Sequence, residues 1–118
     1  MALEDDLQAL LMARCERSFP LTAPHDTQLP YLIWQHVGGD SLRFLDNTAP
    51  ATRNAAIQVT AWAATPRSAF LLIRQVEDAL CASPALQAAP QGEPVDAPDD
   101  ADEIFGATQT FSVWGART

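Results

Sequence analysis

Lysine is absent from this chain of 118 residues, so all seven of its basic side chains are arginines. Fifteen acidic residues outweigh them, which gives a formal net charge of −8 and a pI of about 4.4. A protein that grips nucleic acid needs a basic patch to neutralise phosphates. The sequence contains no such patch, and we therefore do not expect a nucleic-acid-binding protein.

Long apolar runs are also missing. No segment approaches the roughly 18 consecutive apolar residues that a membrane helix needs. The chain begins with Met1-Ala2-Leu3-Glu4-Asp5-Asp6, and these acids replace the positive charge that opens an export signal. We expect a protein without a membrane partner that is made in the cytoplasm and stays there until it is assembled or released.

Residues that could catalyse a reaction or bind a metal ion are scarce. The two cysteines, Cys15 and Cys81, lie far apart and outside any CxxC or histidine-rich setting, which predicts buried or half-buried reduced thiols and no metal site. His36 falls on a predicted strand and is interpreted as structural. His25 stands beside Asp26, but no serine or cysteine nucleophile has a recognisable setting. We predict no catalytic, cofactor-binding or metal-binding residue, and hence no enzyme.

The acidic charge is concentrated near the C-terminus. Residues 91–118 hold six acids and one arginine, a balance of −5, whereas residues 1–90 hold nine acids and six arginines, a balance of −3. The acidic run lacks the alternating ligands and the central glycine of an EF-hand calcium loop. We interpret it as a solvent-facing part of a Pro/Asp-rich loop region at 84–103. Its acids are Asp96, Asp99, Asp100, Asp102 and Glu103.

Hydrophobic periodicity predicts helices over 2–16 and 66–82 and main strands over 31–37, 53–64 and 104–114, with room for an edge strand at 94–98. Thr65-Pro66 is a favourable helix start, and Arg74 is spaced to pair with Asp78. Strands without an intervening helix pair antiparallel most easily. We therefore predict one α+β domain over residues 1–118. It would contain a small antiparallel sheet with helices packed on one face, in the order helix-strand-strand-helix-strand.

The strand at 31–37 carries large apolar side chains on both faces, so a helix or another subunit should cover each face. The polar segment 38–52 is long for a connection between paired strands, and long loops are often functional. Short strand extensions around 41–45 would fit its sequence.

These segments resemble a known family. The evidence is the strand Leu29-Pro30-Tyr31-Leu32-Ile33-Trp34-Gln35, the strand Ala56-Ile57-Gln58-Val59-Thr60-Ala61-Trp62-Ala63 that runs directly into a helix, and the closing Thr110-Phe111-Ser112-Val113-Trp114. Together with the leucine-rich N-terminal helix, this pattern is similar to the tail-completion or tail-terminator proteins of long-tailed phages, prophages and gene-transfer particles. The resemblance spans nearly the whole chain and departs from the family at 84–103, which is richer in Pro and Asp.

The resemblance implies a structural virion protein, assembled in the host cytoplasm and located in the tail and neck, without a cofactor. A ring of copies, six in this family, would end the tail tube and form the tail side of the head-tail joint. Its partners would be itself, the tail tube protein and the head-tail connector or stopper protein, with genomic DNA passing through without specific binding.

Tryptophans and long loops suit such interfaces. The residues that we predict to lie in the interface are Asp40, Ser41, Arg43, Phe44, Asp46, Trp34 and Trp62. The acids of 96–103 are predicted to face the channel or its rim, where they would repel DNA.

Three other functions compete with this interpretation. Another neck component, such as a head-completion or stopper protein, would have a similar size. An acidic protein that binds a basic host factor would need acids spread over its whole surface, whereas most of this charge lies in the last 28 residues. A small enzyme would need a site that the sequence does not show.

Overall fold

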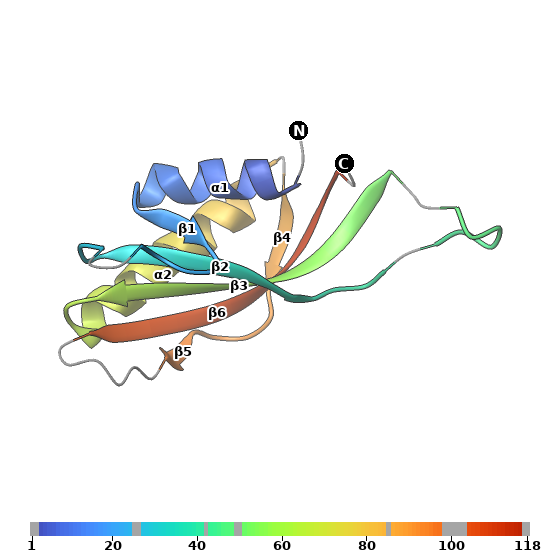
Figure 1. Cartoon of the computed structure of the whole chain (residues 1–118). Helices are drawn as coiled ribbons and strands as arrows, with labels where there is room; N and C mark the ends of the chain where they lie inside the picture. The colour runs from blue at the N-terminus through green and yellow to red at the C-terminus, as the bar shows by residue number, and fades with distance from the viewer. Residues whose placement is uncertain are drawn as a thin grey trace.

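A computed structural model describes residues 3–24, 27–41, 43–48, 51–84, 86–97 and 104–116. Within these residues the fold is α+β, with two helices on a mixed six-stranded sheet (Figure 1). The elements are α1 (Leu3–Arg14), β1 (Ser18–Pro20), β2 (Tyr31–Gly38), β3 (Thr52–Ala63), α2 (Pro66–Ala82), β4 (Gln87–Pro90), β5 (Val95–Ala97) and β6 (Phe105–Ala116). The predicted α+β class is confirmed, while the predicted order helix-strand-strand-helix-strand was incomplete because it lacked β1, β4 and β5, of which only β5 had been allowed for as an edge strand.

The strands follow the order β1-β2-β3-β6-β4, and β5 also pairs with β6. The three long strands β2, β3 and β6 are antiparallel, as predicted, but β1 pairs with β2 in parallel. The sheet is therefore mixed rather than purely antiparallel. The expected edge strand at 94–98 is present as β5, and no strand extension occurs in the described part of 41–45.

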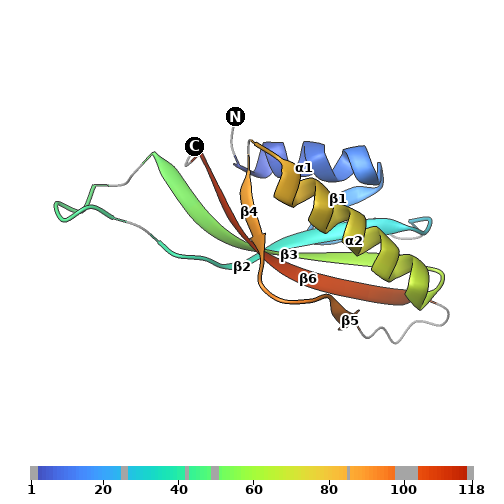
Figure 2. The same ribbon diagram turned by 180° about the vertical axis from the view of Figure 1, so that it is seen from behind.

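The helices pack on one face of the sheet, as predicted (Figures 1 and 2). Alternate residues of each long strand are buried beneath them, such as Leu32 in β2, Val59 in β3 and Phe111 in β6. In α1 the buried positions are Leu3, Leu7 and Leu11, and in α2 they are Ala69, Ile73, Val76 and Leu80. These positions repeat at helical spacing, so each helix presents one apolar stripe to the sheet.

The start of α2 confirms the predicted cap, because the Thr65 hydroxyl accepts a hydrogen bond from the Ser68 backbone N–H at 3.1 Å. The predicted pairing of Arg74 with Asp78 is not formed. Arg74 instead donates to the Glu93 carboxylate at 2.6 Å, and this bond is the main cause that raises the pKa of Arg74. The pair joins α2 to the chain between β4 and β5, which local helix spacing could not reveal.

Two glutamines connect the layers. Gln8 of α1 accepts a hydrogen bond from the Trp34 indole N–H at 2.7 Å and donates to the Ser18 carbonyl at 2.7 Å. Gln109 of β6 is buried under α2, where its amide donates to Glu77 at 2.5 Å and to the Gly92 carbonyl at 2.9 Å. Both side chains fix elements that are remote in sequence.

The cysteines differ from each other in exposure. Cys15 is half-buried, as predicted, but Cys81 is exposed near the end of α2, so that part of the prediction was wrong. Desolvation of the thiol by its neighbours on α2, together with the negative charges of Glu77 and Asp78, raises the pKa of Cys81. No helix in the described part of the chain is long and apolar enough to cross a membrane.

Candidate interface formed by an arm and an open sheet face

A long arm lies between β2 and β3 and projects beyond the end of the helix layer (Figures 1 and 2); its described residues are 39–41, 43–48 and 51. It gives the molecule its elongated shape, with extents of 53 × 26 × 22 Å. The arm thus carries side chains away from the domain that supports it.

The arm ends in an ordered turn, residues 44–48, which we call the arm tip. The Phe44 N–H donates to the Thr48 carbonyl and the Asn47 N–H donates to the Phe44 carbonyl, both at 2.8 Å. The Asp46 carboxylate accepts from the Thr48 hydroxyl at 2.6 Å and from its N–H at 3.0 Å. These bonds favour the charged carboxylate and hold the pKa of Asp46 below its usual value. The tip is closed by its own hydrogen bonds and needs no other part of the chain.

Two large apolar side chains are presented to solvent by this turn. Phe44 is 58% exposed and Leu45 is 107% exposed. Single exposed apolar residues are common on protein surfaces, but these two are adjacent at the end of a projecting arm. A contiguous apolar patch in such a place is typical of a contact with another molecule.

The root of the arm is fixed to the domain. Gly39 has φ +120° and packs so tightly that an added Cβ would lie 2.8 Å from the Ala55 Cα atom. The Asp40 N–H donates to the Asn54 side chain at 2.9 Å. Only glycine fits this close approach with that backbone angle. The first residues of the arm therefore lie against β3 and are held there.

Charged side chains gather beside this root on the helix side of the sheet. Glu4 of α1 forms an ion pair with Arg53 of β3 and contacts His36 of β2 at 3.0 Å. The His36 ring also meets the Trp34 ring edge-to-face at 5.7 Å. His36 thus has structural contacts, in agreement with its interpretation from the sequence.

The face of the sheet opposite the helices, which we call the open face, is covered by no helix of the described residues (Figure 2). The side chains at its centre are half-buried and uncharged. The Trp62 ring lies over Gly106, where an added Cβ would come within 2.7 Å of it. The central residues of the open face are Tyr31, Ile33, Gln35, Gln58, Thr60, Trp62, Thr108, Thr110, Ser112 and Trp114.

Several polar side chains of this face are paired with one another across the strands. The Thr60 and Thr108 hydroxyls are 3.2 Å apart, and the Gln35 amide donates to the Gln58 carbonyl oxygen at 2.7 Å. A partner that covered these groups would leave few of them without a hydrogen bond.

Most of the predicted interface residues lie on the arm. Asp40, Ser41, Arg43, Phe44 and Asp46 are all exposed there, and Trp62 lies on the open face. Trp34 instead points toward the helices and is only 5% exposed, so it belongs to the core. The prediction omitted Leu45, although its place before Asp46-Asn47 marks it as a turn residue.

The predicted acidic rim is described only in part. Asp96 is exposed on β5 and pairs with Ala107 of β6. Asp99, Asp100, Asp102 and Glu103 lie outside the described residues.

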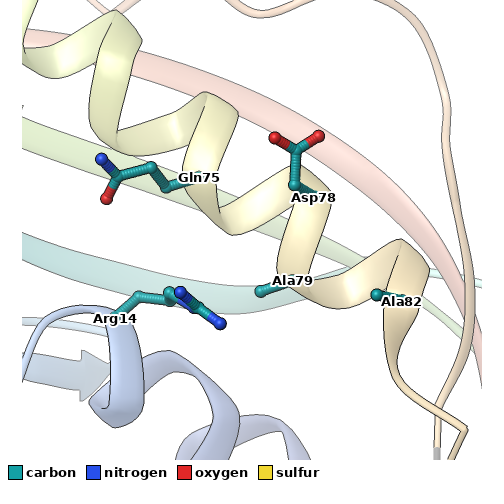
Figure 3. A pocket seen from close by; sticks show the side chains of 5 residues that line it. All are labelled: Arg14, Gln75, Asp78, Ala79 and Ala82. Atoms are coloured by element: carbon teal, nitrogen blue, oxygen red, sulfur yellow. The ribbon is translucent and has the colours of Figure 1, made fainter.

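A shallow hollow of about 210 Å³ separates α1 from α2 (Figure 3). Small-molecule sites usually have volumes of about 300 Å³ or more and mostly apolar linings. Arg14 reaches toward Ala79 here, and the other lining residues are Gln75, Asp78 and Ala82. Among the described residues no three His, Cys, Asp or Glu side chains are grouped to hold a metal ion. The arm and the open face are thus the stronger candidates for a functional surface.

The family described as tail completion protein gp17 matches residues 2–114 of the chain. The match covers both helices and nearly all of β6, and it confirms the resemblance seen in the sequence. No curated protein matches the chain. Because the family match extends over almost the entire length, the chain belongs to the phage tail completion protein gp17 family.

Proposed function

We propose that this virion tail protein ends the tail tube as a ring, with six copies as the expected number, and forms the tail side of the head-tail joint. The observation that carries the proposal is the match to a tail completion family over residues 2–114. In this role the chain would contact other copies of itself, the tube protein and the connector or stopper protein, while the genome passes through its centre.

The shape of the subunit supports a ring. A closed ring of identical subunits uses two different surfaces on each copy, one facing each neighbour. The arm tip and the open face lie at different places in the fold and are available as two such surfaces (Figure 1). A protein with a single self-complementary surface would instead form dimers.

Electron microscopy of particles produced without this gene tests the proposal. Without a terminator, we expect tails of abnormal length, or normal heads beside unjoined tails. Intact, joined particles would contradict the proposal. Full heads that leak DNA beside normal free tails would instead assign the chain to the head side of the neck.

The acidic segment 96–103 also has a proposed position in the ring. The wall of a DNA channel must not hold phosphates, and acids repel them. We propose that Asp96 and the other acids of 96–103 face the channel or its rim. Asp99→Arg with Asp100→Arg should then slow DNA delivery from assembled particles, measured as genome release per particle. Unchanged release from particles that contain the variant would contradict this assignment, and Asp5→Arg with Asp6→Arg in α1 is the charge-matched control.

A further inference from the structure

We propose that the arm tip of one copy packs on the open face of the next copy in the ring. This inference rests on the proposed ring and assigns the two surfaces that form its subunit contact. The occupant of the open face would be Phe44 and Leu45 of a neighbouring chain.

The two surfaces carry little net charge. Each copy carries a net charge of −8, so neighbouring copies repel one another unless they meet through uncharged surfaces. None of the described strand residues that point to the open face is charged. Asp96 is paired with Ala107, whose side chain points to the helices, so this acid is not on the open face. At the arm tip the one charged side chain is Asp46, and Arg43, which precedes the tip and donates to the Asn47 carbonyl, adds one positive charge, so the formal charges of residues 43–48 sum to zero.

The open face can be covered at a small desolvation cost. Burying polar groups under an apolar partner is costly when those groups lose hydrogen bonds to water. On the open face the side chains of Gln35 and Gln58 bond to each other, as do those of Asn54 and Ser112 at 2.9 Å. Apolar tip residues can therefore cover this face at a small cost, while Trp62 and Ile33 supply apolar contact area.

Geometry excludes contact between the tip and the open face of the same chain. The root at Gly39 and Asp40 is held against β3, and the arm continues beyond the end of the helix layer (Figures 1 and 2). Leu45 is accordingly 107% exposed. The tip can therefore reach an open face only on another copy, and such a head-to-tail contact generates a ring when its rotation closes.

The contact between one tip and one face is small. Two apolar side chains bury a few hundred Å², below the roughly 1,200 Å² of a stable standard-size interface. The contact gains strength when several copies are held together, because each further contact is then intramolecular. Copies would thus associate weakly in solution and strongly on the end of a tail tube.

Disulfide cross-linking in assembled particles tests the inference. In the full chain Cys15 and Cys81 are replaced by serine, and Leu45→Cys is combined with Thr60→Cys. After mild oxidation, non-reducing gels should show a ladder of linked copies whose upper limit is the number in the ring. The matched control combines Leu45→Cys with Arg67→Cys, since Arg67 is exposed at the start of α2 on the opposite side of the sheet, and should give no ladder.

The outcomes separate the inference from the proposed function. Particles that hold a ring but give no ladder with Leu45→Cys and Thr60→Cys would overturn the inference alone. Linkage of Leu45→Cys to the tube protein or the connector would also overturn it and would identify the true partner of the arm tip. Particles that contain a single copy of the chain would overturn both the ring and this contact.

Discussion

Particles made with Phe44→Ser and Leu45→Ser should lose head-tail joining at least about tenfold, while the thermal stability of the purified chain stays the same. Central apolar anchors of an interface each contribute about 2 kcal/mol or more, and every 1.4 kcal/mol changes affinity about tenfold. Within the chain, Leu45 is fully exposed and the turn at the arm tip is closed by backbone and Asp46 hydrogen bonds. Removing the two side chains therefore removes a surface for partners and leaves the fold intact. Joined particles are counted by electron microscopy, and unfolding is followed by circular dichroism.

A matched control distinguishes the effect of losing the arm tip from the effect of losing any exposed apolar side chain. Leu71 of α2 is 53% exposed and lies on the helix layer, away from both proposed surfaces. Leu71→Ser should leave joining unchanged, at a cost in stability of about 0.5 kcal/mol for an exposed helical site. Normal joining by the tip variant, or equal loss in both variants, would contradict a special role of the arm tip.

How far the sequence predicts this fold depends on the length of each element. The alternation in β3 and β6 continues over many residues, so it identified both strands and divided their side chains correctly between two faces. In contrast, β1 has three residues, which is too few for any period. Its parallel pairing with β2 depends on contacts distant in sequence, such as the Leu32 N–H that donates to the Arg17 carbonyl at 2.9 Å.

The two tryptophans show why the sequence could not tell core residues from surface residues among the predicted interface positions. Alternation correctly placed Trp34 with Leu32 and Trp62 with Thr60, but it did not say which face of β2 the helices cover. That information lies in the register, which pairs Trp34 with the buried Val59 and Tyr31 with Trp62. Register is set by the folded sheet as a whole, and a one-residue slip would exchange the two faces. The sequence therefore indicated that both tryptophans make contacts, but it did not distinguish a contact in the core from one on the surface.

The arm was also only partly predictable from the sequence. Its length and polar composition indicated a functional loop, and five predicted interface residues do lie on it. The turn that exposes Leu45 depends on Asn47 at φ +69° and on the bonds of Asp46, which composition alone did not reveal. Local hydrogen bonding thus decides which residues of a loop are presented to a partner.

Phe111→Ala should lower the free energy of unfolding by about 4 kcal/mol, the largest loss expected from one substitution in the core. Phe111 is fully buried in β6 and lies opposite Ile57 of β3, beneath the helix layer. Its removal leaves a cavity that the neighbouring strands cannot close, because β6 pairs with β3 along its whole length. Urea unfolding of the purified variant measures the loss.

Thr110→Val is the matched control for this prediction, since it lies one residue away but points to the open face. It keeps a β-branched side chain of nearly the same size, so we expect a change within about 0.5 kcal/mol. A loss below about 1 kcal/mol for Phe111→Ala would mean that the helices do not depend on β6 for their packing. The expected loss has a functional consequence, because β3 and β6 carry both the open face and the root of the arm. Loosening this strand pair should disturb the two proposed contact surfaces together.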